Sequence, residues 1–137
     1  MFDETTEFGA RVARRLRDEQ IIWLVTAGKD GVPQPSPVWF LWANQRFLIF
    51  SEPDKPKLRL IAQNPTVALH FDGDGQGGNI IVFIGTAEVL AQAPVEEMGP
   101  LLDKYGAAIK RLGSTPEKMA QEYSVVFRVT PSRVRGH

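Results

Sequence analysis

The sequence predicts a mainly β fold, a small closed barrel with α-helices on its outside. Runs of β-branched and aromatic residues recur along the 137 residues and are separated by turn residues. The longest helical patterns lie outside the succession of strands rather than between every pair, which disfavours a doubly wound parallel sheet. Composition does not change along the chain, so we expect a single domain over residues 1–137.

The first predicted element is an amphipathic helix from about Thr6 to Asp18. Phe8, Val12 and Leu16 follow at intervals of four and therefore share one face. The other face carries Arg11, Arg14, Arg15 and Arg17. We expect the helix to cover the barrel and its arginines to face solvent, because the 16 basic and 16 acidic residues balance and no nucleic-acid surface is indicated.

The next segment, Ile21 to Pro65, organises the rest of the chain. It contains three apolar runs joined by turn signals at residues 29–31 and 43–45, with Gly31 suited to positive φ. In the middle run, from Val38 to Trp42, every residue is apolar, so we expect one strand buried on both faces. The barrel interior would cover one face of this strand, and a partner subunit or a planar ligand would cover the other. Prolines at 33, 35 and 37 place this segment at an edge, a bulge or the rim of a site.

A short basic helix follows this strand region. Asp54 is its expected N-cap, Pro56 lies in its first turn, and Asn64-Pro65 ends it. Lys55, Lys57 and Arg59 surround its N-terminal half, where free amides and the helix dipole favour an anion. The pattern fits an anion site and a solvated basic face equally well.

The second half continues with strands at residues 66–72 and 79–92, joined by a glycine-rich loop. Gly85 is the expected bulge. A helix from Pro94 to Leu112 is expected in two pieces, broken at Gly99-Pro100. Ser114 and Glu117 resemble a capping box for a short helix through Glu122.

The last strand is expected from Ser124 to Arg135. Val125, Phe127 and Val129 would face inward, and Val126, Arg128 and Thr130 outward. The terminal residues Arg133, Arg135 and His137 fit either a basic tail or a wall of the site.

Few residues offer catalytic chemistry of their own. The chain has no cysteine and only His70 and His137 as histidines, and no carboxylate pair at metal spacing lies near them, so no metal site is predicted. No serine lies in a nucleophile-elbow pattern, and no catalytic residue is assigned. The reactivity would have to come from a cofactor such as a flavin or deazaflavin. With zero net charge and no signal or spanning segment, we expect a cytoplasmic protein that binds neither nucleic acid nor membrane.

Several sequence segments together resemble a known family. They are WLVT, DGVPQPSPVWFLW, SEPDKPKLR, ALHFDGDG, GTAEV and RVTPSRVR. The chain is similar to the pyridoxamine 5'-phosphate oxidase-like, FMN-binding split-barrel superfamily, and in particular to its actinobacterial branch of deazaflavin (coenzyme F420)-dependent enzymes. This resemblance covers nearly the whole chain.

The resemblance implies a six-stranded split β-barrel that forms a homodimer with cofactor sites at the interface. It places Lys55 and Lys57 at the cofactor phosphate, and Pro37, Val38, Trp39 and Phe40 along the tricyclic ring. The chain departs from the family at Leu60, where asparagine is frequent, and at His137, where an aromatic residue is frequent.

These observations favour a coenzyme F420-dependent oxidoreductase that reduces a small unsaturated or conjugated substrate by hydride transfer. Two alternatives remain open at this point. One is an FMN-dependent oxidase or flavin reductase of the same fold, and the other is a module that binds a cofactor or pigment without turnover.

Overall fold

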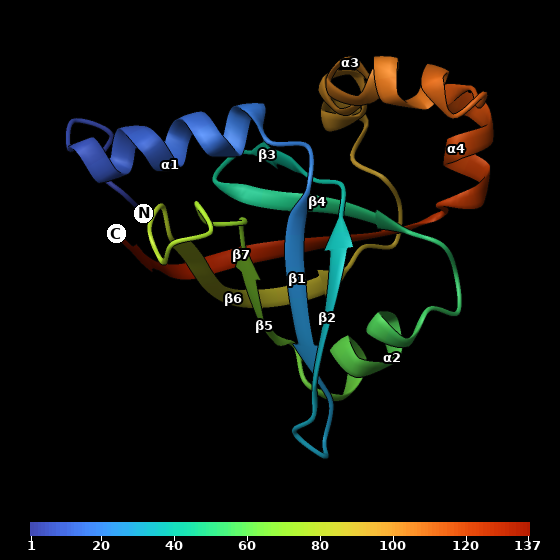
Figure 1. Cartoon of the computed structure of the whole chain (residues 1–137). Helices are drawn as coiled ribbons and strands as arrows, with labels where there is room; N and C mark the ends of the chain where they lie inside the picture. The colour runs from blue at the N-terminus through green and yellow to red at the C-terminus, as the bar shows by residue number, and fades with distance from the viewer.

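The computed structural model describes residues 1–137 and contains four helices and seven strands (Figure 1). The elements are α1 (Glu7–Asp18), β1 (Ile22–Ala27), β2 (Pro33–Val38), β3 (Leu41–Ala43), β4 (Arg46–Ser51), α2 (Pro56–Gln63), β5 (Thr66–His70), β6 (Ile81–Val89), α3 (Val95–Arg111), α4 (Pro116–Glu122) and β7 (Val125–Gly136). None of the four helices combines the length and the apolar character needed to cross a membrane.

All strands belong to one antiparallel sheet with the order β2-β1-β5-β6-β7-β4-β3. The predicted mainly β class with peripheral helices is confirmed. The sheet curls into a half-barrel whose edges, β2 and β3, follow one another in the chain but are not joined by a ladder. The barrel is therefore split, as the resemblance implied, and not closed as the strand pattern predicted. The sheet has one strand more than the six that the resemblance implied.

The extra strand arises because the run from Val38 to Trp42 is not one strand. β2 ends at Val38 and β3 begins at Leu41, so Trp39 and Phe40 lie in a break between them. The Phe40 N–H donates to the Tyr105 hydroxyl at 2.8 Å instead of joining a ladder. The expectation of one continuous strand from Val38 to Trp42 is therefore wrong. Within the break, Phe40 is fully buried and Trp39 is half-buried.

The prolines of β2 fit the predicted edge position. β2 pairs only with β1, with Pro33, Pro35 and Pro37 opposite Ala27, Val25 and Trp23. An edge strand tolerates alternate missing amides because they face away from its single neighbour.

The core lies inside the curl of the sheet, with α1 over it. Phe40, Phe47 and Phe83 form its aromatic centre, and adjacent ring centroids lie 5.8 and 5.1 Å apart. Val12 and Leu16 of α1 belong to the same cluster. Thr6 caps α1 by accepting the Gly9 N–H at 3.0 Å, which supports the predicted boundary.

Two arginines of α1 do more than face solvent. Arg11 donates to the Asn79 side chain at 2.7 Å, and Arg15 donates to the Asp72 carbonyl at 2.8 Å. They hold both ends of the glycine-rich loop against the helix, so the solvated-face prediction is wrong for these two.

Gly85 forms the predicted bulge. The register of β6 against β7 shifts between Ile84 and Gly85. A Cβ atom at Gly85 would lie 2.6 Å from the Thr130 carbonyl oxygen, so only glycine allows this close approach. The bend helps the two longest strands to curl.

Helix boundaries differ from the predictions at three places. Asp54 has a φ of +64° and precedes the N-cap of α2, which is Lys55. α3 continues through Pro100, so the predicted break at Gly99-Pro100 is wrong. The N-cap of α4 is Thr115, which accepts the Lys118 N–H at 3.2 Å, so the Ser114–Glu117 capping box does not form.

β7 follows the predicted alternation with one exception. Phe127 and Val129 are buried and Thr130 is exposed. Val126, expected outside, is buried against Leu41 and Leu48 in a second small cluster, with Leu101 of α3 packed on it. The side of the sheet away from the main core is thus covered here by α3.

Candidate functional site

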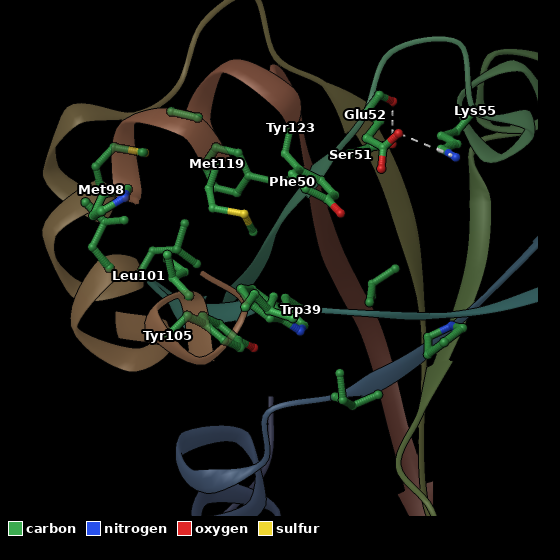
Figure 2. Close-up of a pocket in the computed structure, with 18 of the residues that line it drawn as sticks. Trp39, Phe50, Ser51, Glu52, Lys55, Met98, Leu101, Tyr105, Met119 and Tyr123 are labelled. Carbon is green, nitrogen blue, oxygen red and sulfur yellow. Dashed lines mark hydrogen bonds and ion pairs between the residues drawn. The ribbon is translucent and has the colours of Figure 1, made fainter. Parts of the chain in front are cut away.

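A cavity of about 540 Å³ lies between the sheet and the pair of helices α3 and α4 (Figure 2). The sheet side is built by the end of β2, the break after it and the end of β4, and the other wall by α3 and α4. Thirteen of its 19 lining residues are hydrophobic. Its size and its mostly apolar lining are typical of a site for an organic ligand or cofactor.

A flat aromatic wall lies at the centre of this cavity. The rings of Trp39 and Tyr105 are stacked with centroids 4.4 Å apart and planes 5° apart, and Figure 2 shows them side by side. The Tyr105 hydroxyl accepts the Phe40 N–H at 2.8 Å and lies 2.6 Å from the Gln20 carbonyl oxygen, to which it donates. Burial raises the pKa of Tyr105, so its hydroxyl stays protonated and holds the wall in place.

One end of the cavity is charged. Ser51, Glu52, Lys55, Lys57 and Tyr123 line it. Lys55 lies 3.6 Å from the Glu52 carboxylate, whereas Lys57 forms no ion pair. Burial and then the charge of Lys55 lower the pKa of Lys57. An anion placed at this end would compensate both effects.

Tyr123 joins the charged end to the helical wall. Figure 2 shows it between Met119 and the Ser51–Glu52 segment. Burial, followed by the carboxylate of Glu52, raises the pKa of Tyr123. Its phenol is therefore a neutral hydrogen-bond donor at physiological pH.

Five of the seven predicted site residues line the cavity: Pro37, Val38, Trp39, Lys55 and Lys57. Phe40 does not, because its side chain is fully buried in the core and only its backbone helps to shape the wall. Arg59 is exposed and lies outside the cavity lining. Residues two apart on a helix are rotated by about 200°, so Arg59 and Lys57 face in different directions.

The helical wall is the part that the sequence reasoning missed. Met98, Leu101, Met119 and Tyr123 line the cavity, and Figure 2 shows Leu101 and Met119 pointing toward the space beside Trp39. The apolar residues of α3 recur at helical spacing, and such a pattern does not distinguish a cavity wall from ordinary core. The short α4 gave no periodic signal, since none of its residues is buried.

The histidines and the C-terminal arginines lie elsewhere. His70 stacks on Trp23 with ring centroids 6.4 Å apart, on the outside of the sheet. His137 contacts the Gly77 carbonyl at 2.9 Å. None of Arg133, Arg135 and His137 lines the cavity of its own chain. No three His, Cys, Asp or Glu side chains come together where they could hold a metal ion.

Comparisons with known proteins agree with this architecture. The family model for pyridoxamine 5'-phosphate oxidase matches residues 8–137. No curated protein matches the sequence.

Three solved structures share the fold at low sequence identity. The haem storage protein HutZ from Vibrio cholerae has a TM-score of 0.72 at 13% identity, with 96% of this chain and 95% of that chain covered. An F420 reductase has a TM-score of 0.67 at 20% identity, with coverages of 89% and 94%. An FAD-binding protein from Mesorhizobium loti has a TM-score of 0.63 at 21% identity, with coverages of 91% and 88%.

Proposed function

Because the chain belongs to the pyridoxamine 5'-phosphate oxidase family, we propose that its cavity binds a flavin-type cofactor and that the protein is a coenzyme F420-dependent oxidoreductase. Its substrate would be a small unsaturated or conjugated organic molecule. The observation that carries the proposal is the combination, in one cavity, of an unpaired lysine at one end and a rigid aromatic wall at the centre.

The residues present fit a flavin or deazaflavin, which joins a planar ring system to a phosphate-bearing chain. Lys57 has no anionic partner of its own and Lys55 lies beside it, so a phosphate would be held by charge-assisted contacts. Trp39 offers a flat face for the ring, and α3 and α4 contribute apolar side chains to the same cavity. The cofactor, when bound, supplies the hydride chemistry that these side chains lack.

Two neighbouring functions remain as alternatives. FMN has the same ring-and-phosphate architecture, and the FAD-binding neighbour supports a flavin in this fold. The likeness to HutZ supports storage of a pigment without turnover. Against haem, neither histidine of this chain lies in the cavity, so no imidazole is available there to bind an iron.

The first test is an optical titration of the purified protein with coenzyme F420 and with FMN separately. We then expect reduced F420 to be reoxidised by quinones, enones or tetrapyrroles only when both protein and acceptor are present. Tight binding without acceptor-dependent reoxidation would favour the storage function. Tight binding of FMN with no binding of F420 would favour the flavin alternative.

The second test concerns the phosphate contact. Lys57→Ala should weaken cofactor binding about tenfold or more, because a charge-assisted contact contributes about 1.5–3 kcal/mol. The loss should shrink at high salt. Arg59→Ala is the matched control, since it removes the same charge from the same helix outside the cavity. If only Arg59→Ala weakens binding in calorimetric titration, the phosphate lies on the outside of α2.

A further inference from the structure

The two ends of the cavity differ sharply in charge. Glu52, Lys55 and Lys57 are the only charged residues in its lining, and all three come from the connection between β4 and the start of α2. The opposite end, under α3 and α4, is lined by Met98, Leu101, Leu102, Ile109, Leu112 and Met119.

No charged side chain lies at this apolar end. The hydroxyl of Tyr105, which belongs to the same wall, is already shared among the Phe40 N–H, the Gln20 carbonyl and the Phe40 carbonyl. An ionised group buried here would lose its water without gaining a partner, which is strongly unfavourable. An uncharged apolar group has far less hydration free energy to lose on burial.

We propose that the end of the cavity under α3 and α4 is the acceptor subsite, and that it selects an uncharged, apolar conjugated molecule. This inference rests on the proposed function, in which the cofactor phosphate takes the lysine end. A charged acceptor would then find both lysines occupied and no other cationic group in the cavity lining.

The wall suits a class of acceptors rather than one shape. Methionine side chains are flexible and polarisable and adapt to irregular apolar ligands. Met119 lies on α4, which has no buried residue and borders the cavity through Pro116, Met119 and Ala120. Small displacements of α4 would admit different outlines while leaving the wall apolar.

The three methionines of the chain provide a direct measurement. Met98 and Met119 line the cavity, and Met1 lies at the exposed N-terminus as an internal control. Protein labelled at the methionine methyl groups is titrated with methyl cinnamate and with cinnamate, which share one conjugated skeleton and differ in charge. Phosphate buffer supplies an anion that competes for the two lysines. The ester should shift the Met98 and Met119 methyl signals and bind at least about tenfold more tightly than the acid.

A matched pair of variants then tests the cause. Met119→Arg should weaken ester binding and bring the affinity for cinnamate to that of the ester or above it. Gln121→Arg, an exposed position on the same helix outside the cavity, should leave both affinities unchanged. Equal binding of ester and acid to the wild-type protein, or shifts confined to Met1, would overturn the inference, and this holds even if Met119→Arg does not fold. If the ester binds as expected but reduced F420 is never reoxidised, the apolar site stands and the oxidoreductase does not.

Discussion

At the scale of single residues, Tyr105 has the widest influence. Its ring stacks on Trp39, and its hydroxyl contacts backbone groups of Gln20 and Phe40. This one side chain therefore connects α3 to the residues just before β1 and just before β3. The residue satisfies the buried Phe40 amide at the point where the strand breaks. The same contacts keep Trp39 in the orientation that forms the cavity wall.

Tyr105→Phe should therefore destabilise the protein although it changes almost no volume. The Phe40 N–H would stay buried without its acceptor, which costs about 1–3 kcal/mol in the free energy of unfolding. Tyr123→Phe is the matched control, because Tyr123 is only half-buried and no backbone amide depends on it. Urea denaturation of both variants measures the difference. Equal losses for the two would contradict this role of Tyr105.

Lys104 gives a prediction about pH. Its Nζ lies 3.6 Å from the Phe40 ring centroid and donates to the Phe40 carbonyl at 3.0 Å, and burial still lowers its pKa from 10.5 to about 8. Between these two pH values the unfolded chain binds more protons than the folded one, so this group makes stability rise with pH. Lys104→Met removes the desolvation cost of this buried charge.

We expect Lys104→Met to be more stable than the wild-type protein at pH 7, and its advantage to shrink as pH rises from about 8 to 10.5. Melting temperatures of both proteins across this range measure the effect, and Lys110→Met serves as the exposed control. An advantage that stays constant with pH would show that the buried charge is not the cause.

At the scale of elements, local chemistry made some features predictable and long-range contacts decided the others. Pro56 and Thr6 have roles set by their own backbone or by neighbours within three residues, and these were readable from the sequence. The break after Val38 depends on Tyr105, 65 residues away from its partner Phe40, which no local pattern encodes. The same holds for the cavity. Its lysine end, which depends on local sequence, was predicted, whereas its wall from α3 and α4, which depends on long-range packing, was not.

The position of α3 also depends on a long-range contact. Glu97 in its first turn is 5% exposed and its carboxylate lies 2.7 Å from Arg128 of β7, with Asn44 donating at 3.2 Å. Neither partner has another ion pair, so removal of one leaves the other largely buried without an opposite charge.

Glu97→Met or Arg128→Met alone should each cost about 3–5 kcal/mol in the free energy of unfolding. The double variant should lose much less than the sum, because it buries no unpaired charge. Urea denaturation of the wild-type protein, the two single variants and the double variant gives the coupling energy of the pair. Additive losses would show that the pair is not coupled and that something else holds α3 on the sheet.

At the scale of the whole molecule, the outer face of the sheet suggests how the predicted homodimer forms. The pairing register aligns Trp23, His70 and Val82 in one row, and Val25, Ala68 and Ile84 in the next. All six are only half-buried in the single chain. Trp42, by contrast, packs on Phe47 with ring centroids 4.8 Å apart, so the strand expected to form the interface is largely used inside the chain.

This outer face is continuous with the cavity. Trp23 pairs with Pro37 of β2, and Pro37 lines the cavity, as does the adjacent and 40% exposed Ile21. We propose that a second copy covers the two rows and reaches the rim of the cavity, which would place the cofactor sites at the interface. Contact between copies would bury a tryptophan and three β-branched residues that water now reaches in part.

The protein should therefore behave in solution as a particle of about twice its 15.3 kDa chain mass. Ile84→Glu should shift it toward monomer, because a charge at the centre of the face would be buried without a partner. Ala107→Glu adds the same charge at an exposed position of α3 and should leave the mass unchanged. Sedimentation of the wild-type protein, Ile84→Glu and Ala107→Glu measures dimer formation, and cofactor titration of the same three proteins measures whether the dimer completes the site. A wild-type monomer, or a monomeric Ile84→Glu variant with undiminished cofactor affinity, would show that a single chain forms the whole site.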